Sequence, residues 1–297
     1  YSLAPILQYS DMNGYGWTLT TQNWYLLYWS SLAVVLSIVS FSLWHRGPHS
    51  RLRARFKMLP YQIGRGGFTA ISVCLLLFLG SGSIIHYNTK VLNKFTTQNE
   101  ALNDRELYEK EFARFEDDPT PIIISVDAEI AIFPSASRVE TITKIIVENR
   151  TNKAIEKFLV NHPNFSPVSE VEIEGGSLGK REAVDVAWFT FDKPMQPGEK
   201  RNGTIKVVRE HKGFKDRGED TEVVRNGTFI SNFSLYPSFG VNQRFYIGDQ
   251  HERRKRELGP PRRAYLLEDS SRYNESFFGP QTALIDFKAT LSTSTDQ

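Results

Sequence analysis

Residues 23–44 read NWYLLYWSSLAVVLSIVSFSLW, and from Trp24 to Trp44 there is no charged residue over 21 positions. At a rise of about 1.5 Å per residue, a helix of this length spans roughly 30 Å, the thickness of the hydrocarbon core of a bilayer. Aromatic residues gather at both ends, as they do at membrane interfaces: Trp24, Tyr25, Tyr28, Trp29 and Trp44. This stretch therefore predicts a membrane-spanning helix over 24–44.

A second uncharged run extends from Gly67 to Tyr87 and carries VCLLLFL at its centre. Two such runs in tandem are rare in soluble proteins, and the first starts too late and is too long for a signal peptide. Between them, 45–66 holds six Lys/Arg and no acid. Short basic loops stay in the cytoplasm, so we expect both outer ends of the hairpin to face the opposite side. Contact of this loop with anionic headgroups is expected to add little.

Charge is distributed unevenly along the chain. Through Lys90 one acid, Asp11, stands against seven bases, whereas the remainder holds 29 basic and 33 acidic residues. This segregation excludes a simple cytoplasmic enzyme. The lone cysteine, Cys74, excludes a disulfide scaffold and a cysteine metal site. Since the chain begins at Tyr1 and its last residues show no stop-like feature, we expect it to be a fragment of a longer protein.

Beyond Asn88 the chain becomes polar, and 89–118 reads as a juxtamembrane linker. A helix is predicted over 103–118, with Asn103 and Glu106 spaced as a capping box. An apolar stripe at helical spacing is expected to pack against the following domain rather than against lipid: Tyr108, Phe112 and Phe115.

From Pro121 the period of the hydrophobic pattern changes to two. One strand face is predicted to hold Ile122, Ile124, Val126, Ala128, Ile130 and Ile132. A turn and a second alternating run at 139–147 predict a hairpin, and further strand-like runs lie at 184–191, 204–208 and 283–291. The predicted fold is thus a membrane α-helical hairpin followed by an all-β sandwich at 119–297, with 1–22 as an extracytoplasmic loop.

No catalytic, cofactor-binding or metal-ligating residue is predicted. His251-Glu252 begins the HExxH pattern of zinc hydrolases, but basic residues follow where the second histidine should stand. Asp249 and Glu252 are interpreted as partners for those bases. The basic run 251–263 lacks interleaved aromatics, so we expect a solvated or domain-contacting loop and no nucleic acid; 216–220 is expected to be a solvated turn.

The near absence of cysteine favours a bacterial periplasm over a eukaryotic cell surface. Six glycosylation triplets argue the other way and are attributed to asparagine-rich turns, without being dismissed: Asn149, Asn164, Asn202, Asn226, Asn232 and Asn274.

Seven short segments together resemble one family: DMNGYG (11–16), WYLLYW (24–29), YNTKVLN (87–93), RNGTF (225–229), YPSFG (236–240), RRK (253–255) and STSTDQ (292–297). The family comprises large bacterial membrane proteins in which an ABC-transporter-permease-like region is fused to a periplasmic metallopeptidase of the aminopeptidase N (gluzincin) family. The last segment departs from the family's STSPDQ, with Thr295 in place of proline.

The resemblance implies that the two helices are the last of the membrane region and that 119–297 is the N-terminal β-domain. The zinc-binding domain would follow, so zinc is expected in the parent and not in this chain. The implied partners are the lipid bilayer, the missing permease helices and catalytic domain, an ATP-binding transporter subunit, and a peptide substrate. The alternatives are a non-enzymatic permease-associated protein with a docking or sensing β-domain and, as a third reading, a free-standing two-span anchor with an adhesin-like domain.

Overall fold

The computed structural model describes residues 7, 9, 11, 14–44, 52–93, 95–162, 168–182, 184–215, 223–224, 227–260, 268, 270 and 284–294. It divides into two compact units. The first comprises Tyr1–Phe95 with His211–Thr221, and the second comprises Thr96–Glu210 with Glu222–Gln297.

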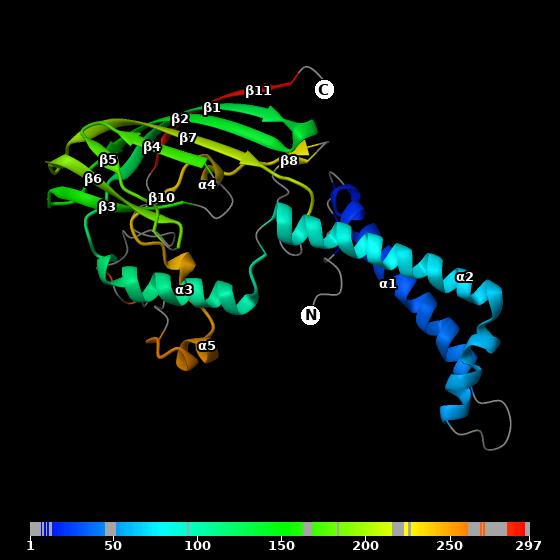
Figure 1. Cartoon of the computed structure of the whole chain (residues 1–297). Coiled ribbons are helices and arrows are strands. Elements are labelled where there is room, and N and C mark those ends of the chain that lie inside the picture. The colour runs from blue at the N-terminus through cyan, green and yellow to red at the C-terminus, as the bar shows by residue number, and fades with distance from the viewer. Residues whose placement is uncertain are drawn as a thin grey trace. The chain divides into compact units, whose positions relative to one another are not determined.

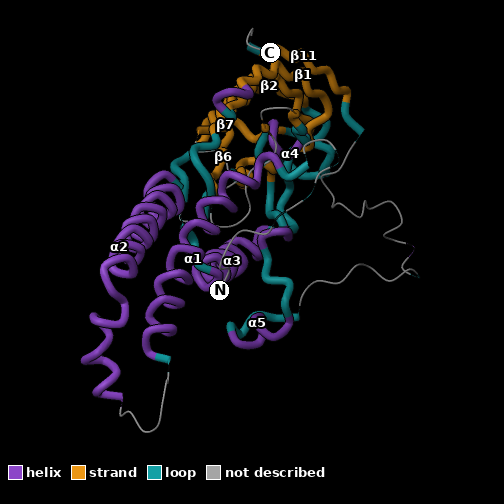
Figure 2. Tube along the Cα trace, turned by 90° about the vertical axis from the view of Figure 1, so that its right-hand side faces the viewer, coloured by secondary structure: helices purple, strands orange, loops and turns teal. Residues whose placement is uncertain are grey.

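The first unit is a pair of long apolar helices that pack side by side (Figure 1 and Figure 2). Helix α1 spans Gly16–Leu43 and α2 spans Leu52–His86, followed by a π-helical turn η1 at Tyr87–Leu92. Both are long and apolar enough to cross a membrane, by length and composition. Their contact includes the Tyr28 ring stacked on Phe78 at 4.3 Å between centroids.

Part of the predicted basic loop is helical. Helix α2 starts at Leu52, within the predicted loop 45–66, and is broken at Gly64, whose φ is 64° and ψ 177°. Residues 45–51 lie outside the described part of the chain. The connection predicted over 45–66 therefore contains a helix at 52–63, and its position on the cytoplasmic side stays a prediction.

Two β-sheets form the second unit. The first has the order β11-β1-β2-β7-β4 and the second β10-β3-β6-β5; a short pair, β8 and β9, stands apart. The bounds are β1 Ile122–Phe133, β2 Arg138–Glu148, β3 Ile155–Asn161, β4 Val168–Ile173, β5 Gly176–Leu178, β6 Val186–Met195, β7 Lys200–Glu210, β8 Val223–Val224, β9 Gly227–Thr228, β10 Ser238–Phe239 and β11 Asp286–Thr293. Only β11, which runs parallel to β1, breaks the antiparallel pairing of the described strands.

The core lies between the two sheets, as in a β-sandwich. It combines residues of the first sheet, such as Val126, Ile145 and Ile205, with Phe158 and Phe189 of the second. The predicted inner face of β1 is confirmed from Val126 to Ile132. It is wrong at Ile124, because a bulge between Ile123 and Ser125 shifts the register and brings Ile123 to the core side instead.

A helical layer covers the outer face of the second sheet (Figure 1). Helix α3 spans Gln98–Phe112 and continues as the 3₁₀ turn η2 at Ala113–Phe115. As predicted, Tyr108 and Phe112 pack on the sheet, against Leu159 and Val186, with Phe115 against Trp188. The remaining short helices are α4 (Asn232–Leu235), α5 (Gln250–Lys255), and the 3₁₀ turns η3 (Pro134–Ala136) and η4 (Gln243–Phe245).

The capping box of α3 lies earlier than predicted. Thr97 accepts a hydrogen bond from the Glu100 backbone, and the Glu100 carboxylate accepts one from the Thr97 backbone. The prediction of Asn103 and Glu106 as the cap is wrong, because both lie inside the helix.

Candidate functional site

His251 and Glu252 lie on α5, where Lys255 stands at the position of the second histidine of an HExxH motif. Asp249 caps this helix by accepting from the Glu252 backbone at 2.8 Å, which lowers the pKa of Asp249. The Glu252 carboxylate pairs with Lys255 at 3.0 Å and with Arg256 at 3.7 Å. The interpretation as a partner of the adjacent bases is confirmed for Glu252, whereas Asp249 serves as the helix cap. Across the described residues no three His, Cys, Asp or Glu side chains gather to hold a metal ion.

The basic run on α5 instead forms a buried ion pair with α3. Arg253 is 4% exposed and Glu109 is 8% exposed. The guanidinium donates to both carboxylate oxygens, at 2.9 Å from Nη1 and 2.5 Å from Nη2. It also donates to the carbonyls of Ile247 at 2.6 Å and Gly259 at 2.7 Å. Each of its three nitrogens is thus bonded, as a buried charge requires.

A second, more exposed pair joins the same two helices. Arg256 donates to Glu106 at 2.7 Å and to Asn103 at 2.8 Å. Hydrogen bonds from Lys110 and then from Arg256 hold the pKa of Glu106 below its usual value. Asn103 and Glu106, which were predicted as a helix cap, therefore connect α3 to the end of α5.

Tyr108 is the polar centre of the interface between α3 and the sheet. Its hydroxyl donates to Asn161 Oδ1 at 2.7 Å and accepts from the Asn242 backbone at 2.9 Å. Asn161 in turn donates to the carbonyls of Ser238 and Gly240. Burial raises the pKa of Tyr108 to about 12, so the phenol stays protonated at neutral pH.

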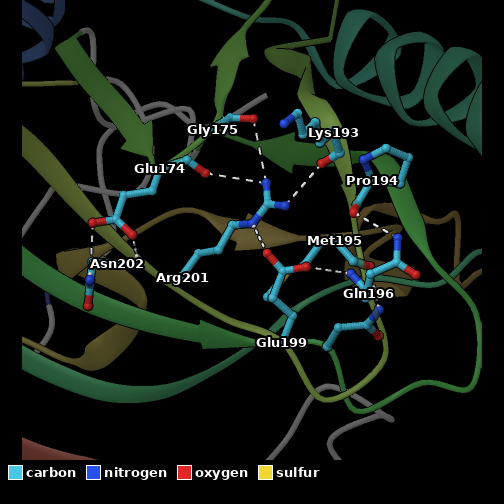
Figure 3. Close-up of polar contacts among 10 residues, drawn as sticks. Glu174, Gly175, Lys193, Pro194, Met195, Gln196, Glu199, Arg201 and Asn202 are labelled. Carbon is cyan, nitrogen blue, oxygen red and sulfur yellow. Dashed lines mark hydrogen bonds and ion pairs between the residues drawn. The ribbon is translucent and has the colours of Figure 1, made fainter.

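Arg201 occupies the centre of a polar cluster at one end of the sandwich (Figure 3). It donates to Glu199 at 2.7 Å and to the Lys193 carbonyl at 3.0 Å, with a longer contact to the Glu174 carbonyl at 3.4 Å. The guanidinium also lies over the Phe191 ring, at 4.4 Å from its centroid. Arg201 belongs to β7 of the first sheet and Lys193 to β6 of the second, so Arg201 connects the sheets.

Two carboxylates of this cluster are held in their ionised form. The hydrogen bond from Arg201, together with one from the Gln196 backbone, lowers the pKa of Glu199. The side chain and backbone of Asn202 bond to Glu174 and lower its pKa. All of these donors belong to the protein, and the arrangement is that of a structural cluster.

Buried hydrogen bonds exclude one of the six glycosylation triplets in the folded domain. Asn149 is fully buried, and its amide nitrogen donates to the carbonyls of Lys153 at 2.8 Å and Met195 at 2.9 Å. The attachment atom of a glycan is therefore inaccessible. Asn164, Asn226 and Asn274 lie outside the described residues, as do 216–220.

A shallow groove of about 630 Å³ opens between the helices of the first unit. It is lined by Tyr28, Phe78, Leu79, Gly82, Ser83, His86, Tyr87 and Val91. A side chain at Gly82 would meet the Tyr28 ring at 3.0 Å, so this glycine already serves the approach of α1. Cys74 lies in the middle of α2, half-buried.

The comparisons with known proteins give no family. No protein-family model matches the chain, and no curated protein matches it. A solved M1 zinc metallopeptidase from Deinococcus radiodurans matches at 11% identity and a TM-score of 0.26, covering 32% of this chain and 21% of that one. A mutant from the same organism, bound to a Tyr-Ser-Ala substrate, gives 12% and 0.27, covering 34% and 23%. The chain thus spans about a fifth of the length of these proteins.

Proposed function

We propose that this chain is the membrane anchor and N-terminal β-domain of a bacterial zinc aminopeptidase fused to an ABC-transporter-permease-like region. The two helices belong to a multi-pass region of the inner membrane, and the β-domain lies in the periplasm. Its role is to attach and position a peptidase that binds its zinc outside these residues. The segments that resemble this family support the proposal, together with the two features below.

The burial pattern of the helix pair is the main support for placing it in a membrane. Apart from Tyr25, the buried side chains among its described residues are small and hydroxylated: Thr18, Thr21, Ser31, Ser42, Ser81 and Thr89. Several bond to carbonyls of their own helix, as Ser81 does to Leu77 at 2.6 Å. Large apolar side chains point outward, with Leu36 56% and Leu76 71% exposed. Helices of soluble proteins bury their large apolar side chains and expose polar ones, whereas small residues line the contacts between helices in membranes.

The free edge of the first sheet supports a further domain. Phe287 and Leu291 of β11 are 48% and 65% exposed. They lie on the same side of the sheet as Val126 and Ile130, their register partners on β1, which are buried. Apolar side chains that the described part of the chain leaves exposed on β11 favour a contact with another protein domain.

The orientation is tested with single cysteines in the native-length protein with Cys74 replaced by alanine. Lys57→Cys, before the kink of α2, should react with a membrane-impermeant maleimide only after cell lysis. Lys144→Cys, on the exposed face of β2, should react in intact spheroplasts. Reaction of both positions, or of neither, in spheroplasts would contradict the proposed orientation.

The enzymatic assignment is tested by metal analysis of the purified native-length protein. About one zinc per chain, with cleavage of N-terminal residues from peptides, would support the aminopeptidase. Absence of zinc and of cleavage would favour the second candidate, a permease-associated protein with a docking β-domain. The exposed side of β11 is equally suited to that role.

A further inference from the structure

The first part of α2 is a separate helix with two unlike faces. Phe56, Leu59 and Ile63 follow one another at a spacing of three and four residues and share a face. Lys57 and Tyr61 share the opposite face. Phe56 is 59% exposed, whereas Leu59 and Ile63 are half-buried, so the described residues of the unit cover this apolar face only in part. This pattern is typical of a helix that lies at a boundary between an apolar and an aqueous medium.

Gly64 separates this helix from the apolar run that follows. Its φ of 64° and ψ of 177° fall in a region that essentially only glycine adopts. A side chain there would meet no atom within 4 Å, so the requirement for glycine is conformational and not one of space. The bluer start of α2 accordingly runs in a different direction from its cyan remainder (Figure 1).

The position of the helix along the chain fixes its distance from the bilayer. Phe68, where the apolar run resumes, lies only four positions after Gly64. Four residues span at most about 14 Å. If 68–87 crosses the membrane, the end of the 52–63 helix next to Gly64 lies within this distance of the membrane surface.

Its charge fits a negatively charged surface. Arg53, Arg55, Lys57 and Arg65 lie on the helix or directly after it, and there is no acid anywhere in 45–99. A basic residue near an anionic leaflet contributes attraction that adds over the cluster.

From these observations we infer that residues 52–63 form an in-plane helix that binds anionic phospholipid at the membrane surface. Phe56, Leu59 and Ile63 insert between the headgroups, and the basic residues contact lipid phosphates. The contact with lipid therefore has both an apolar and a charged part, and it is larger than the marginal headgroup contact expected of a loop. The inference rests on the proposed membrane insertion of α1 and α2.

The test uses the full chain in vesicles of phosphatidylcholine with phosphatidylglycerol, with Cys74 replaced by alanine. An environment-sensitive fluorophore is attached at Phe56→Cys or, as the matched control on the opposite face, at Tyr61→Cys, which replaces a side chain that is 91% exposed. We expect quenching by aqueous iodide to be at least about threefold weaker at position 56 than at 61. Gly64→Ala should raise the quenching at 56 towards that at 61.

A label at Leu76→Cys separates the two proposals. If it is protected from iodide while positions 56 and 61 are quenched equally, the helix faces water and is available to a protein partner, and the inference is overturned. If it is itself quenched by iodide, membrane insertion fails and the inference fails with it. Equal protection of position 56 in vesicles of phosphatidylcholine alone would overturn the assignment to anionic lipid.

Discussion

Replacing Arg253 with alanine removes the central cation from the contact between α3 and α5. The Glu109 carboxylate, which is 8% exposed, then loses both hydrogen bonds from the guanidinium. It keeps only the Ile247 backbone donor, at 3.4 Å. The carbonyls of Ile247 and Gly259 lose their donor as well. Breaking a buried ion pair by removing one partner costs about 3–5 kcal/mol.

The loss should be measured by hydrogen exchange and mass spectrometry on the full chain in detergent. A cost of about 3 kcal/mol corresponds to roughly 100-fold faster exchange where α3 opens locally. The amides of β2 should keep their rates, because β2 belongs to the first sheet whereas α3 packs on the second. The matched control is Lys206→Ala, because the pair of Lys206 with Glu170 leaves both side chains about half exposed and contributes less than about 1 kcal/mol.

A double variant distinguishes the effect of an unpaired buried charge from the effect of lost side-chain volume. Glu109→Met with Arg253→Met fills a similar volume without a charge and should recover most of the protection. The reasoning is refuted if Arg253→Ala changes exchange in α3 no more than Lys206→Ala does.

Three further predictions concern the second unit. Gly176→Ala should lower the free energy of unfolding by about 1–3 kcal/mol in chemical denaturation, since the added carbon would lie 2.5 Å from Phe189; Gly248→Ala, with nothing within 4 Å, is its control. The pKa of Glu199 is lowered in the folded protein, so its contribution to the free energy of unfolding is present above the usual carboxyl value of 4.5 and is lost as the pH falls below it. Glu199→Gln should therefore weaken the dependence of the free energy of unfolding on pH in the acid range, and an unchanged dependence would contradict the assignment. Because the pKa of Tyr108 is raised from 10 to about 12, its contribution is present below pH 10 and is lost as the pH rises towards 12; Tyr108→Phe should weaken this alkaline dependence and cost about 1–3 kcal/mol at neutral pH, and a variant as stable as the parent would refute it.

Local patterns predicted the parts of the fold in which one face of an element is apolar. The inner residues of β1 and the stripe on α3 alternate cleanly, and both lie where the pattern indicates. Strand β3 was not predicted, because it is covered on both sides: Phe158 faces the sandwich core, whereas Leu159 faces α3. Burial on both faces erases the alternation by which a strand is recognised.

The polar contacts of the second unit could not be predicted from the sequence. Glu109 and Arg253 are 144 positions apart, and neither has a local pattern that marks it as buried. The capping box of α3 is formed by Thr97 and Glu100, and Glu106, which was predicted for that role, is used in the pair with Arg256.

The parallel pairing of β11 with β1 has a consequence for synthesis. Strands β1, β2, β7 and β4 lie within 122–210, so they can pair while the chain is still being made. The outer edge of β1 must wait for β11, about 150 residues later. At about 5–20 residues per second, this edge stays open for roughly 10–30 s. Nascent chains should therefore depend on a chaperone during this interval, and aggregation should begin at β1.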